Sequence, residues 1–222
     1  PDEAAPVETA DAAPATEAEA EDVSATGFIR PGDTVPDSVT AEEGDIPRDS
    51  YGRPFTYAFL GKELPPFTGT MVNGTEFSSS SLYGRWTVVD VWGLWCGDCM
   101  ADAKYVAALS NAIAKDGDMS FLSIHTPPNA KRADEAFGRY GSVDAYFEEK
   151  GYSYPTLIDT DASIRDMLEI AWTPSYLLVA PDGTVQGFRS ELAAADGTPV
   201  KDFMRDIASV RSSYTPLEVE AE

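Results

Sequence analysis

The sequence predicts an α/β fold in which a central mixed β-sheet is flanked by helices, with a β-hairpin added on the N-terminal side. Two observations in the 222-residue chain lead to this fold class. Between residues 86 and 170, short apolar runs that suit strands alternate with runs of helical periodicity. They are followed by two further strand-like runs, joined by a Pro-Asp-Gly turn at residues 181–183 that is typical of a hairpin.

Residues 1–50 differ in composition from the rest of the chain. They contain 14 acidic and 2 basic residues, whereas the other 172 residues contain 24 and 14. Because they are rich in Ala, Glu and Pro and poor in large apolar residues, we expect an extended, disordered linker. We interpret it as a spacer between a membrane anchor and the folded domain; an acidic tail without that role is the alternative. The folded domain is predicted at residues 51–214, followed by an acidic tail at residues 215–222.

The first elements of the domain are short. Residues 55–60 are predicted to form a strand and residues 71–77 a hairpin, because Asn73-Gly74 is a strong turn signal. Residues 78–82 are expected to form a helical turn. Residues 87–92 (Thr-Val-Val-Asp-Val-Trp) are almost continuously apolar, which predicts a central strand that is buried on both faces.

Helix and strand signals continue to alternate in the rest of the domain. The predicted elements are a helix at 99–114, a strand at 121–124, helical segments between 130 and 150, a strand at 156–158, a helix at 163–170, strands at 176–179 and 184–188, and a closing helix at 201–210.

The two cysteines of the chain lie two residues apart, in the run Trp-Cys-Gly-Asp-Cys at residues 95–99. This run follows the predicted central strand and precedes a predicted helix, which is the arrangement of a thiol–disulfide exchange site. The first backbone N–H groups of a helix have no acceptor within the helix and favour a negative charge. We therefore expect Cys96 to be the thiolate nucleophile and Cys99 to be the resolving thiol.

Three other interpretations of the cysteine pair are weaker. A disulfide that closes so short a loop removes little entropy from the unfolded chain, so it would contribute little as a structural crosslink. A zinc site needs about two further ligands, and His125 is the only histidine. A pair of buried, unreactive cysteines remains possible, but the flanking strand and helix signals favour redox chemistry.

The charge of the chain argues against several classes of partner. A net charge of −22 disfavours nucleic acid and anionic membrane surfaces, which are bound by clustered Lys and Arg. No apolar run approaches the roughly 20 residues of a membrane span. The chain starts at Pro1 instead of Met, so we expect a processed form from which a signal peptide or lipid anchor was removed.

The order of elements, with Trp-Cys-x-x-Cys after the first long strand, resembles the thioredoxin fold. The similarity is greatest to the extracytoplasmic TlpA/ResA-type group of the redoxin/AhpC-TSA superfamily, and it covers residues from about 55 to 212. The stretches that carry this resemblance are residues 61–67, 83–92, 154–159 and 172–183.

The resemblance implies further site residues. It identifies Pro174 as a cis-proline that faces the cysteines, and Thr173 as the residue whose backbone pairs with an extended substrate. It places Trp95 and Trp172 along the same substrate groove. It also makes Asp90, six residues before Cys96, a buried acid of raised pKa that accepts the Cys99 proton; a solvated Asp90 at a sheet edge is the alternative.

The chain also departs from the family pattern. The dipeptide Gly97-Asp98 lacks a proline, and the Asp98 charge opposes thiolate formation, which predicts a pair that acts as a reductant and not as an oxidant. Asp102 and Lys104 stand where the group often has Glu and Pro, so the usual helix kink is not expected. We interpret His125 as a loop residue without a redox role; a position next to the site is the alternative.

The sequence as a whole predicts a thiol–disulfide oxidoreductase that chiefly reduces protein disulfides outside the cytoplasm. It would use no dissociable cofactor and no metal, would be tethered only through a removed N-terminal anchor, and would be re-reduced by a membrane electron donor. Two alternatives remain open. One is a redox-sensing or binding module without turnover. The other is a peroxidase, although Gly93 occupies the position where that group has Thr.

Overall fold

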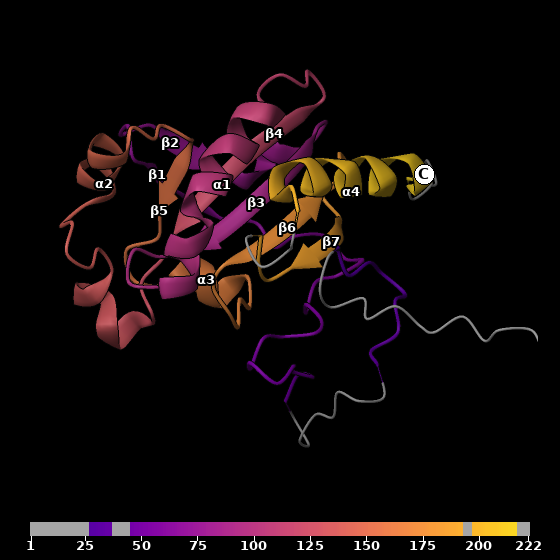
Figure 1. Cartoon of the computed structure of the whole chain (residues 1–222), viewed down its shortest axis with the longest axis horizontal. Coiled ribbons are helices and arrows are strands. Elements are labelled where there is room, and N and C mark those ends of the chain that lie inside the picture. Colours follow the sequence, from indigo (N-terminus) through magenta and orange to yellow (C-terminus); the bar gives the residue numbers. More distant parts are fainter. Residues whose placement is uncertain (1–26, 37–44, 193–196, 217–222) are drawn as a thin grey trace, which may run out of the picture.

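The computed structural model describes residues 27–36, 45–192 and 197–216. A seven-stranded mixed sheet forms its centre, with strand order β2-β1-β5-β4-β3-β6-β7 (Figure 1). The strands are β1 (Thr68–Met71), β2 (Glu76–Ser78), β3 (Trp86–Trp92), β4 (Met119–His125), β5 (Thr156–Ile158), β6 (Ser175–Val179) and β7 (Val185–Arg189). The helices are η1 (Ser79–Leu82), α1 (Gly97–Ile113), η2 (Ala130–Glu135), α2 (Val143–Lys150), α3 (Ser163–Met167) and α4 (Pro199–Ser213). The predicted fold class is confirmed.

β3 is the centre of the sheet, as its apolar sequence predicts. All seven of its residues are buried, and it pairs in parallel with β4 and antiparallel with β6. Its residues alternate between the two faces because side-chain direction alternates along a strand. Val88 and Trp92 belong to the apolar cluster shared with α1 and α4, and Asp90 lies between them on the same face. Val89 and Val91 belong to the opposite cluster, which includes residues of α3 and its C-terminal end.

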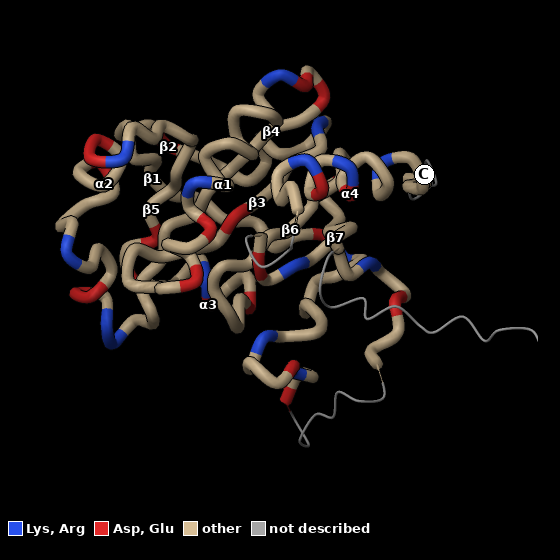
Figure 2. Tube along the Cα trace, viewed as in Figure 1, with Lys and Arg blue, Asp and Glu red and all other residues tan. Residues whose placement is uncertain are grey.

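The two faces of the sheet are covered by different helices. α1 and α4 lie across the same face, as Figure 1 shows, and their buried side chains form one cluster with even-numbered residues of β3. Charged residues lie mainly in loops and on helices, with few in the central strands (Figure 2). Among the described helices, none is long and apolar enough to cross a membrane.

The N-terminal segment, residues 27–36, corrects one prediction. Residues 27–36 were expected to be part of a disordered linker, but Phe28 is buried against Phe203, with ring centroids 5.0 Å apart. Ile29 pairs with Phe188 on β7 through two backbone hydrogen bonds of 2.8 and 2.9 Å. This segment therefore covers the outer edge of β7. Residues 1–26 and 37–44 of the predicted linker lie outside the described residues, whereas residues 45–50 are described.

Residues 55–60 do not form the predicted strand. They make turns, with only an isolated bridge between Leu60 and Val185. Their apolar side chains were the basis of the prediction, and Phe55 and Tyr57 are indeed buried. Ile29 occupies the edge of β7 at Phe188, and the end of this segment bonds to that edge only at Val185, so its aromatic rings pack without adding a strand.

Candidate functional site

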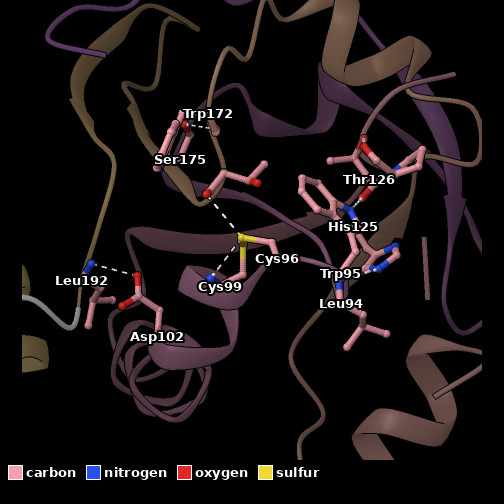
Figure 3. Close-up of a disulfide and its surroundings, with 12 residues drawn as sticks. Leu94, Trp95, Cys96, Cys99, Asp102, His125, Thr126, Trp172, Ser175 and Leu192 are labelled. Carbon is pink, nitrogen blue, oxygen red and sulfur yellow. Dashed lines mark hydrogen bonds between the residues drawn. A yellow bond between two sulfur atoms is a disulfide. The ribbon is translucent and has the colours of Figure 1, made fainter. Parts of the chain in front are cut away.

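The cysteine pair lies at the N-terminus of α1, where β3 leads into the helix. Cys96 is the N-cap residue, and the backbone N–H of Cys99 donates to its Sγ over 3.2 Å. The two sulfurs form a disulfide (Figure 3). Cys96 is 7% exposed and Cys99 3% exposed. The outer position and the helix N-terminus both favour Cys96 as the sulfur that is attacked or attacks first.

The loop before β6 places a backbone carbonyl beside the sulfur of Cys96. The Thr173–Pro174 peptide bond is cis, as the resemblance implies. The carbonyl oxygen of Thr173 lies 3.3 Å from Cys96 Sγ, a contact that becomes a hydrogen bond when the reduced thiol donates (Figure 3). Ser175 Oγ donates to the carbonyl of Trp172 over 2.7 Å, which holds the turn. The site therefore presents a backbone carbonyl directly next to Cys96.

The two tryptophans differ in how they are held. Trp95 donates from its indole N–H to the carbonyl of Thr126 over 2.8 Å. A Cβ on Gly93 would overlap this indole, so the ring can fold back over the loop only because residue 93 is glycine. Trp172 is half-buried, and its buried indole N–H has no partner among the described residues. A Cβ on Gly52 would contact the Trp172 ring, so the turn at Gly52 lies against this tryptophan.

Asp90 is buried beneath α1, as its apolar neighbours predict. It is 1% exposed, and its Oδ1 has no hydrogen-bond partner among the described residues. Burial raises its pKa well above the ordinary value, and the nearby charge of Asp102 raises it further. A buried carboxyl group of raised pKa binds a proton more readily than an exposed one.

Asp102 forms a buried polar cluster that the sequence did not predict. Its carboxylate accepts hydrogen bonds from the Tyr176 hydroxyl and from the backbone N–H of Leu192, each 2.8 Å long. Tyr176 stands directly opposite Asp90 in the β3–β6 register, on the face that α1 covers. Two donors stabilise the ionised form of Asp102, so its negative charge acts on Asp90 from the helix side.

His125 is not the loop residue that we predicted. It is the last residue of β4, fully buried, and its ring stacks on Phe137. Its Nε2 accepts a hydrogen bond of 3.2 Å from the backbone N–H of Leu94, which leaves the proton of the neutral ring on Nδ1. Burial lowers its pKa to about 4. The neutral His125 side chain therefore holds the loop that precedes Cys96, through its hydrogen bond with Leu94.

Gly97 and Asp98 occupy the first turn of α1 and are both exposed. Lys104 is also exposed and stands over the ring of Tyr105, while α1 is assigned as one continuous helix through this position. Within the three described ranges, no group of three or more His, Cys, Asp or Glu side chains is arranged to hold a metal ion. The described groups that can react here are the two sulfurs at the helix N-terminus, which can undergo thiol–disulfide exchange.

The alternation of side chains along β6 was the one sequence signal that could have placed Tyr176 at this site. Tyr176 lies two residues before Leu178, in a strand whose alternate residues face α1. A tyrosine in such a position is normally interpreted as an apolar core residue, so its hydrogen bond was not predicted. A weak sequence signal also existed for Asp102. It lies three residues after Cys99, so the two side chains share one face of a helix that must be buried on one side.

Comparisons with known proteins show which family and which proteins the chain resembles. The family model that matches the chain is that of the redoxins, over residues 59–196. Over 127 residues, the chain is 29% identical to the soluble secreted antigen MPT53 of Mycobacterium tuberculosis, covering 57% of this chain and 66% of that protein. Over 125 residues, it is 22% identical to the thiol-disulfide oxidoreductase ResA of Bacillus subtilis, covering 56% and 64%. The chain thus spans slightly less than two thirds of the length of these relatives.

Solved structures show the same fold at low sequence identity. A Bacteroides thetaiotaomicron protein with the provisional name of protein disulfide isomerase superposes with a TM-score of 0.53 at 20% identity, covering 70% of this chain and 91% of that one. A Neisseria meningitidis protein provisionally named a thioredoxin gives a TM-score of 0.52 at 15% identity, covering 68% and 90%. The fold is therefore thioredoxin-like.

Proposed function

Because the chain belongs to the redoxin family, we propose that it is a thiol–disulfide oxidoreductase that reduces protein disulfides. The observation that carries the proposal is the position of Cys96, at the helix N-terminus and 3.3 Å from the Thr173 carbonyl. An extended substrate that pairs with this backbone would bring its own disulfide next to Cys96 Sγ.

The reaction follows from the two sulfurs and one carboxylate. The Cys96 thiolate attacks a substrate sulfur, so that a mixed disulfide forms and the first substrate thiolate leaves. Cys99 then transfers its proton to Asp90 and attacks Cys96 Sγ, which releases the second substrate thiolate and forms the Cys96–Cys99 disulfide. Two electrons pass from the cysteine pair to the substrate, and the resulting disulfide requires a dithiol donor to be reduced again.

A trapping experiment tests this assignment. In a Cys99→Ser variant the mixed disulfide has no resolving thiol, so covalent complexes with an unfolded, oxidised protein should accumulate; Cys96→Ser is the matched control and should trap none. The wild-type protein should reduce insulin disulfides with dithiothreitol as the electron donor. If both serine variants trap equally, or if the wild type shows no turnover, the chain is a redox-responsive module and not an enzyme.

We further propose that the protein acts outside the cytoplasm, with residues 1–26 as an acidic spacer and a membrane dithiol as the donor. One relative is named as a secreted antigen, and the acidic composition of the segment favours an extended chain. The test is expression of the full reading frame in a bacterium, followed by protease treatment of intact spheroplasts. Digestion by the external protease is expected; full protection would contradict the proposed location.

A further inference from the structure

Arg165 is a half-buried arginine on α3 that contacts three segments around the disulfide. Its Nε donates to the carbonyl of Ile170 over 3.2 Å. Its Nη1 donates to the carbonyls of Pro127 and Pro128 over 3.1 and 2.6 Å. Burial lowers the pKa of its guanidinium, and all three hydrogen-bond acceptors are uncharged. An arginine on the surface of a short helix would avoid this desolvation cost, so its position calls for an explanation.

The backbone of Arg165 is held by one buried carboxylate. Asp159 accepts from the Thr126 hydroxyl over 2.9 Å, and from the N–H groups of Ile164 and Arg165 over 3.2 and 3.0 Å. This side chain therefore ties the start of α3 to the residue that follows β4. The Arg165 backbone is thus held in place by Asp159, and its side chain bonds to Pro127, the residue after Thr126 in the same loop.

The guanidinium also covers the tryptophan next to the nucleophile. Its Cζ lies 5.7 Å from the centroid of the Trp95 ring, in cation–π range. Two contacts thus hold the indole: the Thr126 carbonyl accepts from its N–H, and Arg165 lies over its face. The absence of a Cβ at Gly93 leaves the space that the ring occupies. Figure 3 shows Trp95 and Thr126 on one side of the disulfide and Trp172 on another.

Arg165 therefore connects the two sides of the cysteine pair. Trp95 immediately precedes Cys96, and Ile170 leads within four residues to the cis-proline loop that contacts Cys96 Sγ. We propose that Arg165 is a positioning residue, which sets Trp95 and the cis-proline loop at the spacing that admits a substrate polypeptide. The proposal rests on the proposed function, and it assigns Arg165 to substrate binding and not to the acidity of the sulfur.

The kinetic test compares Arg165→Met with Arg165→Lys, which keeps the charge and one donor group. For insulin reduction, kcat/KM should fall by about tenfold in Arg165→Met, mainly through KM, and by less in Arg165→Lys. Reduction of the small disulfide 5,5′-dithiobis(2-nitrobenzoate) and the reduction potential should stay at wild-type values. Equal losses for both substrates, a shifted potential, or unchanged insulin reduction would overturn the proposal.

A second variant series shows whether Arg165 acts through Trp95. In a Trp95→Ala background, Arg165→Met should change kcat/KM for insulin by less than about twofold, because its target is gone. An undiminished loss in that background would show that Arg165 acts elsewhere. Arg211→Met is the matched control, since Arg211 is also half-buried but pairs with Asp116, beyond the opposite end of α1.

A measurement that does not depend on enzymatic activity can test this inference separately from the proposed function. The Trp95 indole N–H is hydrogen-bonded to Thr126, so its exchange with solvent can be followed by NMR. Exchange should become about tenfold faster in Arg165→Met, through loss of a local restraint, and should not change in Arg211→Met. Unchanged exchange in Arg165→Met would refute the positioning role even if the protein proved to be no enzyme, whereas faster exchange without any insulin reduction would refute only the enzymatic proposal.

Discussion

The two faces of the central sheet are built for different purposes, although they alternate along the same strands. On the face under α1 and α4, the strands β3, β4, β6 and β7 place Asp90, His125, Tyr176 and Arg189. On the opposite face, the same strands contribute apolar side chains such as Val89, Val91, Leu122, Ile124 and Leu177.

This division teaches how a buried redox site is tolerated. Buried titratable groups cost free energy unless they are neutral or hydrogen-bonded. Here they are collected beneath the helix that carries the sulfurs, where Asp102 is bonded by Tyr176 and His125 is held neutral. The other face gains its stability from apolar packing, with no titratable side chain from these strands.

The largest expected effect comes from weakening the apolar face. Leu177 is fully buried on β6, next to Tyr176 but pointing away from α1. Leu177→Ala should lower the free energy of unfolding by about 2–5 kcal/mol through lost burial and a cavity. Urea unfolding measures this. The reduction potential should not change; a shift in potential would show that the two faces are not independent.

His125 should give the next largest effect, and its sign is fixed by its lowered pKa. The folded protein binds the His125 proton only near pH 4, whereas the unfolded chain binds it near the ordinary value of 6.5. As the pH falls from 6.5 to 4, the wild type should therefore lose on the order of 3 kcal/mol of stability. In His125→Gln, whose amide oxygen can still accept from Leu94, this loss should be absent from the urea-unfolding profile. Parallel profiles for the two proteins would contradict the assignment.

The sequence predicted the elements that carry their own signals. β3 is an apolar run, Cys96 stands between strand and helix patterns, and the burial of Asp90 followed from its neighbours. The position of Pro174 came from resemblance, because the spacing of a proline alone does not show that its peptide bond is cis.

The contacts that the sequence could not predict join residues far apart in the chain. Tyr176 and Asp102 are 74 residues apart, and neither lies in a recognisable motif with the other. Phe28 stands in an acidic segment without apolar periodicity, so nothing local shows that it packs against Phe203. Arg165 occupies a helix of five residues, where a charged side chain normally points into solvent. Each of these placements depends on tertiary packing.

Asp90→Asn tests the chemical role of the polar face. If Asp90 accepts the Cys99 proton, resolution of a preformed mixed disulfide near neutral pH should slow by about 10²-fold, as is common when a general base is lost. Stopped-flow measurement of the released substrate thiol follows this step. Attack of Cys96 on the substrate should be unaffected, which provides the internal control. Equal slowing of both steps would mean that Asp90 acts on the whole site and not on Cys99.

For the same variant, the direction in which stability changes with pH can also be predicted. Because folding raises the pKa of Asp90, the wild type is stabilised below about pH 4 and loses that contribution as the pH rises through the folded pKa. Asn cannot ionise, so Asp90→Asn should gain stability relative to the wild type as the pH rises from about 4. This trend is opposite to that of His125. A difference independent of pH would show that Asp90 is not buried as a neutral acid.

The smallest effect is expected at Asp98, which carries the same type of charge as Asp90 but is exposed to solvent. Its charge beside Cys96 opposes the thiolate. A less stable thiolate makes the reduced dithiol less stable, which lowers the reduction potential of the pair. Asp98→Asn should therefore raise the reduction potential, but screening by water should keep the shift below about 30 mV. Equilibration with glutathione measures it. Asp144→Asn is the matched control, because Asp144 is exposed in the first turn of α2 and should leave the potential unchanged. A larger rise would mean that Asp98 contacts the sulfurs directly. A fall would mean that the buried carboxylates, and not the exposed one, determine the potential of the pair.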